Sequence, residues 1–508
     1  MQLHKDRIER EDLVLFINAC LSATSQAEFY EDAKGQSLAL DFLHEYVCRH
    51  YRPLYSRTLA AGINDHARAR IVTELLCGAD KVSKLERATE AKLVATTLAR
   101  MPPQRVYRLF ERVCERRVTN RRVRAVVSEW LATRDMTFDA VKYRRALRTI
   151  VGHFHLRTAG EIGRFLFERH TRDGRYETAL FERWRAAHYA ATSVFELPYS
   201  VAVGFARKHK IAKDEFLEKI APMMTRSERF RTQLAAQRAE ADVAPVELSK
   251  EAPTRIAQFA FALAAQERGE RRDELLAAMD ASVARVCDRS PMRLGRVVAV
   301  LDNSYSTVGS REKRMRPLAV TVAIDALLRS ASRAYTGLWT SAPEDSRWID
   351  VEPRGSTRLA WKVLDALEHK PELVVIVSDG YENDPPGALA SVLSAYRASV
   401  DPKRTVSIVH VNPVFEAASF GAASFGPAVP MVSVRGAEDV LTALGFARFA
   451  DDKATLDELA RYLDGRVEAF LGSMSASQHD DREDEERSSD DAEALAARRE
   501  SSSAEVSS

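Results

Sequence analysis

Arg296-Val-Val-Ala-Val-Leu-Asp302-Asn-Ser304-Tyr-Ser306 is the stretch that decides the fold of the second part of this chain. Its first residues are mostly β-branched or aliphatic, a composition typical of a strand that is covered on both faces. The strand ends in an acid, and two hydroxyl residues follow at alternate positions. We therefore predict a buried strand that presents Asp302, Ser304 and Ser306 at its carboxyl end, where ligand sites of open α/β sheets lie.

Residues 294–472 alternate between short apolar runs and amphipathic segments. This alternation predicts a doubly wound, Rossmann-like α/β domain, and the continuous run Val374-Val-Ile-Val377 predicts a further buried strand. The expected strands are Arg296–Leu301, Tyr335–Trp339, Leu373–Ser378, Thr405–Val411 and Met431–Val434, and the expected helices are Glu312–Ser332, Thr357–Leu367, Ala388–Ala398, Ala437–Ala443 and Thr455–Leu471.

Residues 1–290 have the 3.6-residue periodicity of successive amphipathic helices. Short connections and a spacing of roughly 35 to 45 residues per helix pair favour an all-α, HEAT-like helical-repeat region, with an irregular helical bundle as the alternative. A polar segment with two prolines, residues 241–253, is the expected loop or linker, and Thr254 is the expected N-cap of the next helix. The expected helices include Ala60–Leu76, Leu85–Leu98, Gln104–Arg117, Arg121–Leu131, Asp139–Val151 and Thr254–Val286.

The composition is that of a soluble globular protein, with 45% hydrophobic and 29% charged residues in a chain of 508, which is too long for one core. No apolar run approaches the length of about 18 residues that a membrane span needs, and the charged N-terminus lacks the apolar segment of a secretory signal. The five cysteines are scattered without paired spacing, which argues against a disulfide framework and against a zinc site. We expect a cytoplasmic protein with no membrane partner.

The net charge of +2 hides an uneven distribution. Residues 473–508 contain 11 acids and 4 basic residues, a composition that predicts a disordered acidic tail. Residues 100–148 contain 14 basic residues and 5 acids. The tail is either a solubilising appendage or a segment that binds within the protein. In the second case its acidic residues would occupy the basic region in competition with a ligand, or would bind at the metal site predicted below.

Three predicted loops carry oxygen ligands at the ends of strands. Asp302, Ser304 and Ser306 come first, Thr357 follows in Arg354-Gly-Ser-Thr357, and Asp379 follows in Ser378-Asp379-Gly380. Because all three loops fall on one rim of the predicted sheet, we expect these side chains to lie together. Carboxylates and hydroxyls without His or Cys suit a hard cation, so the sequence predicts a site for Mg²⁺ or Mn²⁺.

This order of motifs resembles the metal-ion-dependent adhesion site (MIDAS) of von Willebrand factor A domains, over residues 294–472. The resemblance implies that Ser304 and Ser306 bind the metal directly, Thr357 directly or through water, and Asp302 and Asp379 largely through water. Asn303 and Tyr305 depart from the small residues of many members, and a tyrosine there would narrow access or stack on a ligand. The alternative is a degenerate A domain that keeps these polar residues for capping and turns.

A helical-repeat region followed by an A domain resembles the Ro autoantigen and its bacterial relatives, the TROVE-module proteins. The segment Phe16–Tyr30 is similar to the opening of that family. The resemblance implies that the helices form a ring closed by the A domain, and that the basic surface of the ring binds small noncoding RNAs and the single-stranded ends of misfolded RNA.

The basic region independently suggests contacts with RNA. Clustered arginines bind phosphates with little sequence dependence and stack on unpaired bases. The alternative is a solvated helical face neutralised by Glu111, Glu115 and Glu129. The candidate RNA-binding residues are Arg105, Arg108, Arg112, Arg116, Arg117, Arg121, Arg122, Arg124, Arg144, Arg145 and Arg148.

Two functional hypotheses follow. The first is a Ro-like RNA-binding protein, for which no DNA partner is expected. The second is an intracellular adaptor that binds a partner's carboxylate through Mg²⁺ and works with an AAA+ ATPase of the MoxR type. We do not expect an enzyme, because the chain has no GxxxxGK[ST] motif and a single Mg²⁺ without a second metal or a base is a poor nuclease centre.

Overall fold

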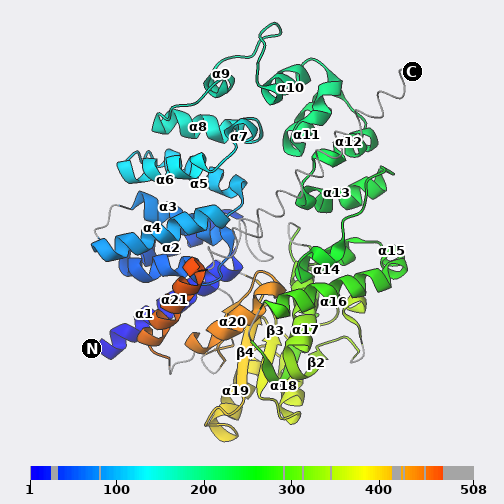
Figure 1. Cartoon of the computed structure of the whole chain (residues 1–508). Helices are drawn as coiled ribbons and strands as arrows, with labels where there is room; N and C mark the ends of the chain where they lie inside the picture. Colours follow the sequence, from blue (N-terminus) through cyan, green and yellow to red (C-terminus); the bar gives the residue numbers. More distant parts are fainter. Residues whose placement is uncertain are drawn as a thin grey trace.

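The structure is a computed structural model that describes residues 2–23, 33–78, 82–289, 292–311, 314–343, 346–414, 425–426, 429–450 and 454–472. Within these ranges a helical region is followed by an α/β domain built on a parallel sheet, so the prediction of these two parts is confirmed (Figure 1). No helix in these ranges combines the length and the apolar character needed to cross a bilayer. The acidic segment 473–508 lies outside the described residues.

The sheet has five parallel strands in the order β2-β1-β3-β4-β5. The strands are β1 (Leu294–Leu301), β2 (Ser332–Trp339), β3 (Leu373–Val377), β4 (Ser407–Asn412) and β5 (Met431–Ser433). Strand β1 lies in the interior of the sheet, where Leu301 pairs with Trp339 on one side and with Val377 on the other. The carboxyl ends of β1 and β3 are therefore neighbours.

Alternate residues of β1 supply two different cores. Val297 and Leu301 belong to the hydrophobic cluster that includes α17 and much of the helical region. Val298 and Val300 belong to the cluster formed with α18 and α19. Because both faces of the sheet are covered, the strand is apolar and buried from Val297 to Leu301, as a doubly wound domain requires. The helices of this domain are α17 (Arg316–Ala331), α18 (Leu359–Glu368), α19 (Ala388–Ser399), α20 (Val440–Ala447) and α21 (Leu456–Gly472).

The first helices stack in two layers. Helix α3 packs on α5 and α5 on α8, while α2 packs on α4 and α4 on α6. Each layer thus joins helices that are not consecutive in the sequence. The helices that precede the α/β domain are α1 (Gln2–Ser22), α2 (Ala33–Arg57), α3 (Asp65–Cys77), α4 (Lys84–Arg100), α5 (Pro103–Glu115), α6 (Arg121–Ala132), α7 (Met136–Lys142), α8 (Arg144–Phe154), α9 (Ile162–Phe167), α10 (Ala179–Ala187), α11 (Tyr199–His209), α12 (Lys213–Ile220), α13 (Arg226–Arg238), α14 (Pro253–Ala262), α15 (Ala265–Glu270) and α16 (Arg272–Asp288).

Two of the predicted helix boundaries in the first half are wrong. Helix α3 begins at Asp65 and not at Ala60, because the Asn64 side chain accepts a hydrogen bond from the Ala67 amide at 3.0 Å and so caps the helix there. The predicted helix Asp139–Val151 is divided at Tyr143, whose φ and ψ of −118° and 28° end α7. Apolar periodicity continued across this break because both pieces face one core.

The predicted helix Thr254–Val286 is also wrong, because it forms three helices, α14 to α16. Ala264 has an extended backbone between the first two helices. Thr254 is not the N-cap, since α14 begins at Pro253. Its hydroxyl instead donates to Glu438 at 2.8 Å and accepts from the Ala437 amide at 2.8 Å. Thr254 thus joins the helical region to the α/β domain.

Residues 241–253 lack α-helix up to the start of α14, apart from a 3₁₀ turn at Leu248–Lys250. This segment is nevertheless packed, because Leu248 is buried and the Glu251 carbonyl accepts hydrogen bonds from Ser282 and Arg285. The segment therefore lies against α16 and contributes to the same core.

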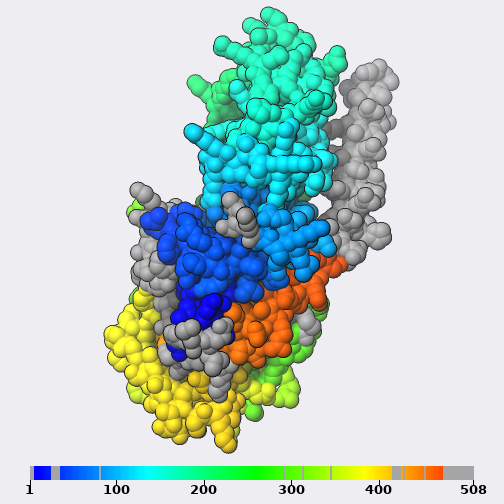
Figure 2. Space-filling model, turned by 90° about the vertical axis from the view of Figure 1, so that its left-hand side faces the viewer, coloured from blue at the N-terminus to red at the C-terminus, as the bar shows by residue number. Residues whose placement is uncertain are grey.

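Both ends of the helical region rest on the α/β domain, so the chain follows a closed circuit (Figure 1). At one end α14 and α16 pack on α17, and at the other end α1 packs on β5 and α21. Arg57 pairs with Asp464 at 2.6 Å, and Arg100 donates to the Phe470 carbonyl at 2.9 Å. Figure 2 shows this second end of the helical region from the side, where the orange surface of the C-terminal helices of the α/β domain lies against the blue surface of the first helices.

Candidate functional site

Three loops meet at the carboxyl edge of the sheet. The Asp302 amide donates to the Val377 carbonyl at 2.9 Å, which joins the loop after β1 to the end of β3. The Tyr305 amide donates to the Gly355 carbonyl at 3.3 Å, and this bond joins the first loop to the one that carries Thr357. The predicted convergence of the three loops is therefore present in the main chain.

Asp302 is the most deeply buried of the predicted ligands, with 0% of its surface exposed. Its Oδ1 accepts from the Ser304 amide at 2.8 Å, and its Oδ2 accepts from the Ser378 hydroxyl at 3.1 Å. Burial, together with the nearby charge of Asp379, raises the pKa of Asp302 to about 6. This carboxylate is held in place but is short of compensating positive charge.

Asp379 completes the pair of acids. Burial raises its pKa, and hydrogen bonds from the Ser306 hydroxyl, the Tyr381 amide and the Ser378 hydroxyl offset part of the rise. The Oγ atoms of Ser304 and Ser306 lie 3.1 Å apart, beside the two acids. The structure therefore brings together four of the five predicted ligands. Hydrogen bonds join Ser304 to Asp302 and to Ser306 and join Ser306 to Asp379, and the charge of Asp379 acts on Asp302.

Thr357 is buried in the second loop, and its amide donates to Asn383 Oδ1 at 2.9 Å. Among the described residues, no hydrogen bond joins its side chain to the other four predicted ligands. Its loop is tied to the third one, since Arg358 and the Ser356 hydroxyl both bond Asp384. Thr357 is thus placed by its loop rather than by direct contact.

Sequence reasoning missed the residues that hold this site in shape. Ser378 anchors Asp302, and Thr340 donates to Asn303 Oδ1 at 3.0 Å while its Oγ accepts from the Asn303 amide at 3.1 Å. Asn303, a departure from the family pattern, also donates to the Glu352 carbonyl at 2.9 Å. Thr340 comes directly after the predicted strand Tyr335–Trp339, so its position at the carboxyl edge was the available signal.

The donor set fits a hard cation. Two buried carboxylates with raised pKa values stand beside hydroxyl groups, and a divalent cation would neutralise their mutual repulsion. The described residues contain no group of three or more His, Cys, Asp or Glu side chains suited to a metal, so a cation here would depend on the two acids together with the hydroxyl groups. Tyr305 is 68% exposed, whereas Asp302 and Asp379 are buried.

The candidate RNA-binding arginines divide into two groups. The guanidinium groups of the first are engaged within the protein: Arg116 bonds Glu74, Arg122 bonds Glu90, Arg124 bonds the His155 carbonyl and Arg144 bonds the Phe165 carbonyl. These four contacts hold neighbouring helices together. They also reduce the number of arginines available for a ligand.

The second group has no side-chain hydrogen bond or ion pair with other described residues. Its members are Arg105, Arg108, Arg112, Arg117, Arg121, Arg145 and Arg148, of which all but the half-buried Arg105 are exposed. Burial lowers the pKa of Arg105, Asp65 raises it, and Arg435 and Arg108 lower it further. Arg435, which follows β5, is therefore close enough to Arg105 for its charge to affect the pKa of Arg105.

A search of protein-family models gave no match to the chain, and no curated protein matched it either. The assignment to A domains and to the Ro type therefore stays a proposal that depends on the residues and the geometry.

Proposed function

We propose that this protein binds RNA in the manner of the Ro type. A basic circuit of helices captures small noncoding or misfolded RNA, and a metal-binding A domain closes the circuit. The observation that carries this proposal is the closed path itself, since α1 and α14 both reach the α/β domain (Figure 1). The two-layer stacking of α2 to α8 supports the HEAT-like interpretation of the helices.

The charge distribution supports RNA as the ligand. Arg105, Arg108 and Arg112 follow each other at helical spacing on α5 and bond no other described side chain. Arg435 adds a guanidinium from the α/β domain to the same neighbourhood. A surface with several unpaired guanidinium groups binds phosphates by releasing counterions, and guanidinium planes also stack on unpaired bases.

The direct test is filter binding of single-stranded RNA over a series of salt concentrations. Each lost phosphate contact lowers the slope of log K against log salt by about 0.7 for single strands, so Arg105→Ala/Arg108→Ala should lower it by about 1.4. Arg116→Ala is the matched control, because its guanidinium is engaged by Glu74 on both nitrogens. Absent affinity at low salt, or affinity without a salt slope, would refute the proposal.

The three converging loops favour a second candidate function. We propose it as an adaptor role, in which the site at Asp302 and Asp379 takes an acidic residue of a partner protein, with an AAA+ ATPase as an associated partner. A Mg²⁺ ion held there supplies an open coordination position for an anionic oxygen. Pull-down of partner proteins by the full chain, with and without EDTA, tests this role. The same pull-down with the Asp302→Asn variant as bait is the second comparison. An unchanged set of captured proteins in both comparisons would count against it.

We propose binding and not catalysis for the metal site. One predicted cation beside two acids, without a second metal, is a poor centre for phosphodiester cleavage. RNA turnover by the wild-type chain that disappears in Asp302→Ala/Asp379→Ala would contradict this assignment.

A further inference from the structure

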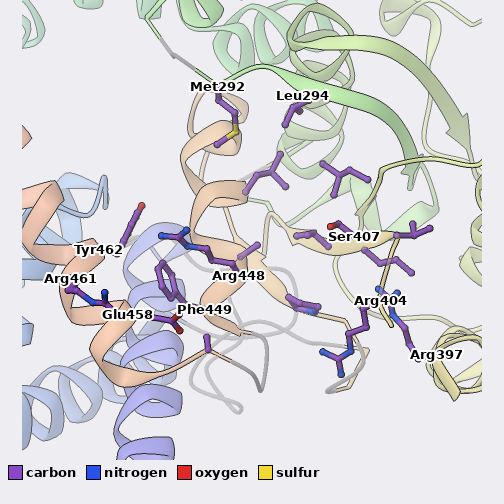
Figure 3. A pocket seen from close by; sticks show the side chains of 18 residues that line it. Met292, Leu294, Arg397, Arg404, Ser407, Arg448, Phe449, Glu458, Arg461 and Tyr462 are labelled. Atoms are coloured by element: carbon purple, nitrogen blue, oxygen red, sulfur yellow. The ribbon is translucent and has the colours of Figure 1, made fainter. Parts of the chain in front are cut away.

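A cavity of about 940 Å³ lies at the opposite edge of the sheet from the three loops (Figure 3). Leu294 and Leu373, at the starts of β1 and β3, form part of its apolar lining, and Leu444 of α20 adds to it. The cavity is therefore at the amino ends of the strands, away from the predicted metal ligands. Its volume is within the range of pockets that bind organic molecules, about 300 to 1,000 Å³.

The cavity lies beside the first half of β4, with which the described residues of β5 do not pair. Strand β4 begins at Ser407, but its pairing with β5 begins only at His410, opposite Met431. The Ser407 amide donates toward β3, to the Glu372 carbonyl, and the His410 amide donates to the other side, to the Pro430 carbonyl. Along a parallel strand, successive residues direct their main-chain amide and carbonyl groups to opposite sides. The main-chain groups of Ile408 therefore point to the β5 side, where no described strand pairs with this residue. The first half of β4 thus forms an open wall of the cavity.

One side of the cavity carries a guanidinium that is held in place by aromatic rings. Arg448 lies 4.6 Å from the ring centre of Phe449 and 5.8 Å from that of Tyr462. Arg461 lines the same side, as Figure 3 shows. Glu458 also lines it, but its carboxylate is occupied by the Thr455 amide and hydroxyl at 2.9 and 3.1 Å.

The other side carries Arg397 and Arg404 (Figure 3). Arg397 pairs with Asp401 at 2.6 Å, and Asp401 also accepts from the Thr405 amide at 2.7 Å. Among the described lining residues, four arginines and one acid, Glu458, therefore surround an apolar floor, and Arg397 is paired with Asp401. This combination of positive walls and an apolar floor is complementary to a molecule that is both anionic and hydrophobic.

We propose that this cavity binds an amphipathic organic anion. Its apolar or aromatic body lies on the floor formed by Leu294 and Leu373, and its phosphate or carboxylate lies at Arg448. The rings under Arg448 fix its position in advance, which lowers the entropy cost of binding the anion. The site is independent of the RNA and adaptor functions. Because α21 forms one wall and also contacts α1 and α2, an occupant would brace the closure of the circuit.

The test is calorimetric titration of the full chain with 1-naphthyl phosphate, with 1-naphthoate and with uncharged 1-naphthol. We expect saturable binding of at least one anion and binding of 1-naphthol that is about tenfold weaker or more, since a charge-assisted hydrogen bond would be lost. The two anions distinguish a phosphate from a carboxylate ligand. We expect Arg448→Ala to weaken anion binding by about tenfold and Ser407→Phe, which places a ring in the cavity, to weaken the binding of the anions and of 1-naphthol alike.

Arg105→Ala/Arg108→Ala is the matched control, because it removes two arginines of the basic face of α5 and leaves the cavity intact. Binding within about twofold of wild type is expected for it, and thermal melts of all variants show that each is folded. The proposal is overturned by three results: no saturable binding of either anion, equal binding by wild type and folded Arg448→Ala, or binding lost in the control variant instead.

Discussion

The side-chain oxygen of Asn18 accepts a hydrogen bond from the main-chain amide of Ser433 at 3.1 Å, across 415 residues of sequence. The side-chain nitrogen of Asn18 donates a hydrogen bond to the main-chain carbonyl of Met431 at 3.1 Å. One side chain of the first helix thus makes the two bonds that a neighbouring strand would make to β5, and it covers the edge of the sheet. This relationship is one of the contacts that close the circuit of helices, beside those of α21 with α1 and α2.

We predict that Asn18→Ala destabilises the protein by about 2 to 4 kcal/mol, because a buried donor and a buried acceptor lose their partners. Urea unfolding measures the change. Asn120→Ala is the control, since Asn120 only caps α6 and should cost about 1 kcal/mol. Equal costs for the two variants would mean that the Asn18 contact does not hold the circuit closed.

The contact made by Asn18 illustrates what the sequence could not predict. The strands and helices of residues 294–472 follow local patterns, so most of their expected positions agree with the structure. The helix predicted over Glu312–Ser332 is wrong at its end, because α17 ends at Ala331 and β2 begins at Ser332, and its predicted start at Glu312 lies outside the described residues. Asn18 lies within an ordinary amphipathic helix, and its partners depend on a strand that is remote in the sequence. Thr254 was misplaced for the same reason, because its hydroxyl serves a contact with Glu438 and not its own helix.

A buried ion cluster supports the layer formed by α2, α4 and α6. Glu90 of α4 accepts from Arg52 of α2 through Nε and a terminal nitrogen, both at 3.1 Å, and from Arg122 of α6. We predict that Glu90→Gln costs about 3 to 5 kcal/mol in urea unfolding, because two guanidinium groups lose their counter-charge in a buried position. Glu45→Gln removes an exposed pair with Arg49 and should cost less than about 1 kcal/mol. A small cost at Glu90 would contradict this role.

Asp439 gives a prediction about pH. Burial, and then the charge of Glu438, raise the pKa of Asp439 to about 7, while Arg435 and Arg68 offset part of the rise. Between pH 4 and pH 7 the unfolded chain has lost this proton and the folded chain keeps it, so stability falls as pH rises through that window. Above pH 7 both states are ionised and the loss is complete.

We therefore expect Asp439→Asn to be more stable than wild type at pH 7 by about 4 kcal/mol at most, and to differ little from it near pH 4. The measurement is urea unfolding of both proteins across this pH range. Parallel stability profiles of the two proteins would show that Asp439 does not titrate abnormally.

The positions of the predicted metal ligands in the fold were predictable in part, and the reason is local. Asp302, Ser304 and Ser306 follow a strand that the sequence marks clearly, so their position at its carboxyl end could be inferred. Ser378 and Thr340 were not recognised as supports, because their partners belong to loops that meet only in the folded chain. Among the arginines, sequence could not separate Arg116 and Arg122, which bond Glu74 and Glu90, from those without such partners.

The last prediction concerns Mg²⁺ itself. Asp302 and Asp379 are buried near each other with raised pKa values, so a divalent cation should stabilise the fold. At a Mg²⁺ concentration of about 100 times Kd the gain is about 2.7 kcal/mol, and we expect a rise in Tm of about 2 to 3 °C that EDTA reverses. Asp302→Asn should lose most of this rise, yet in EDTA it should be at least as stable as wild type, because the repulsion between the acids is gone. Asp384→Asn is the control, since Asp384 lies on the same rim but pairs with Arg358, and it should keep the full response. An equal Mg²⁺ response in Asp302→Asn and wild type, or none in wild type, would show that these loops do not form a metal site.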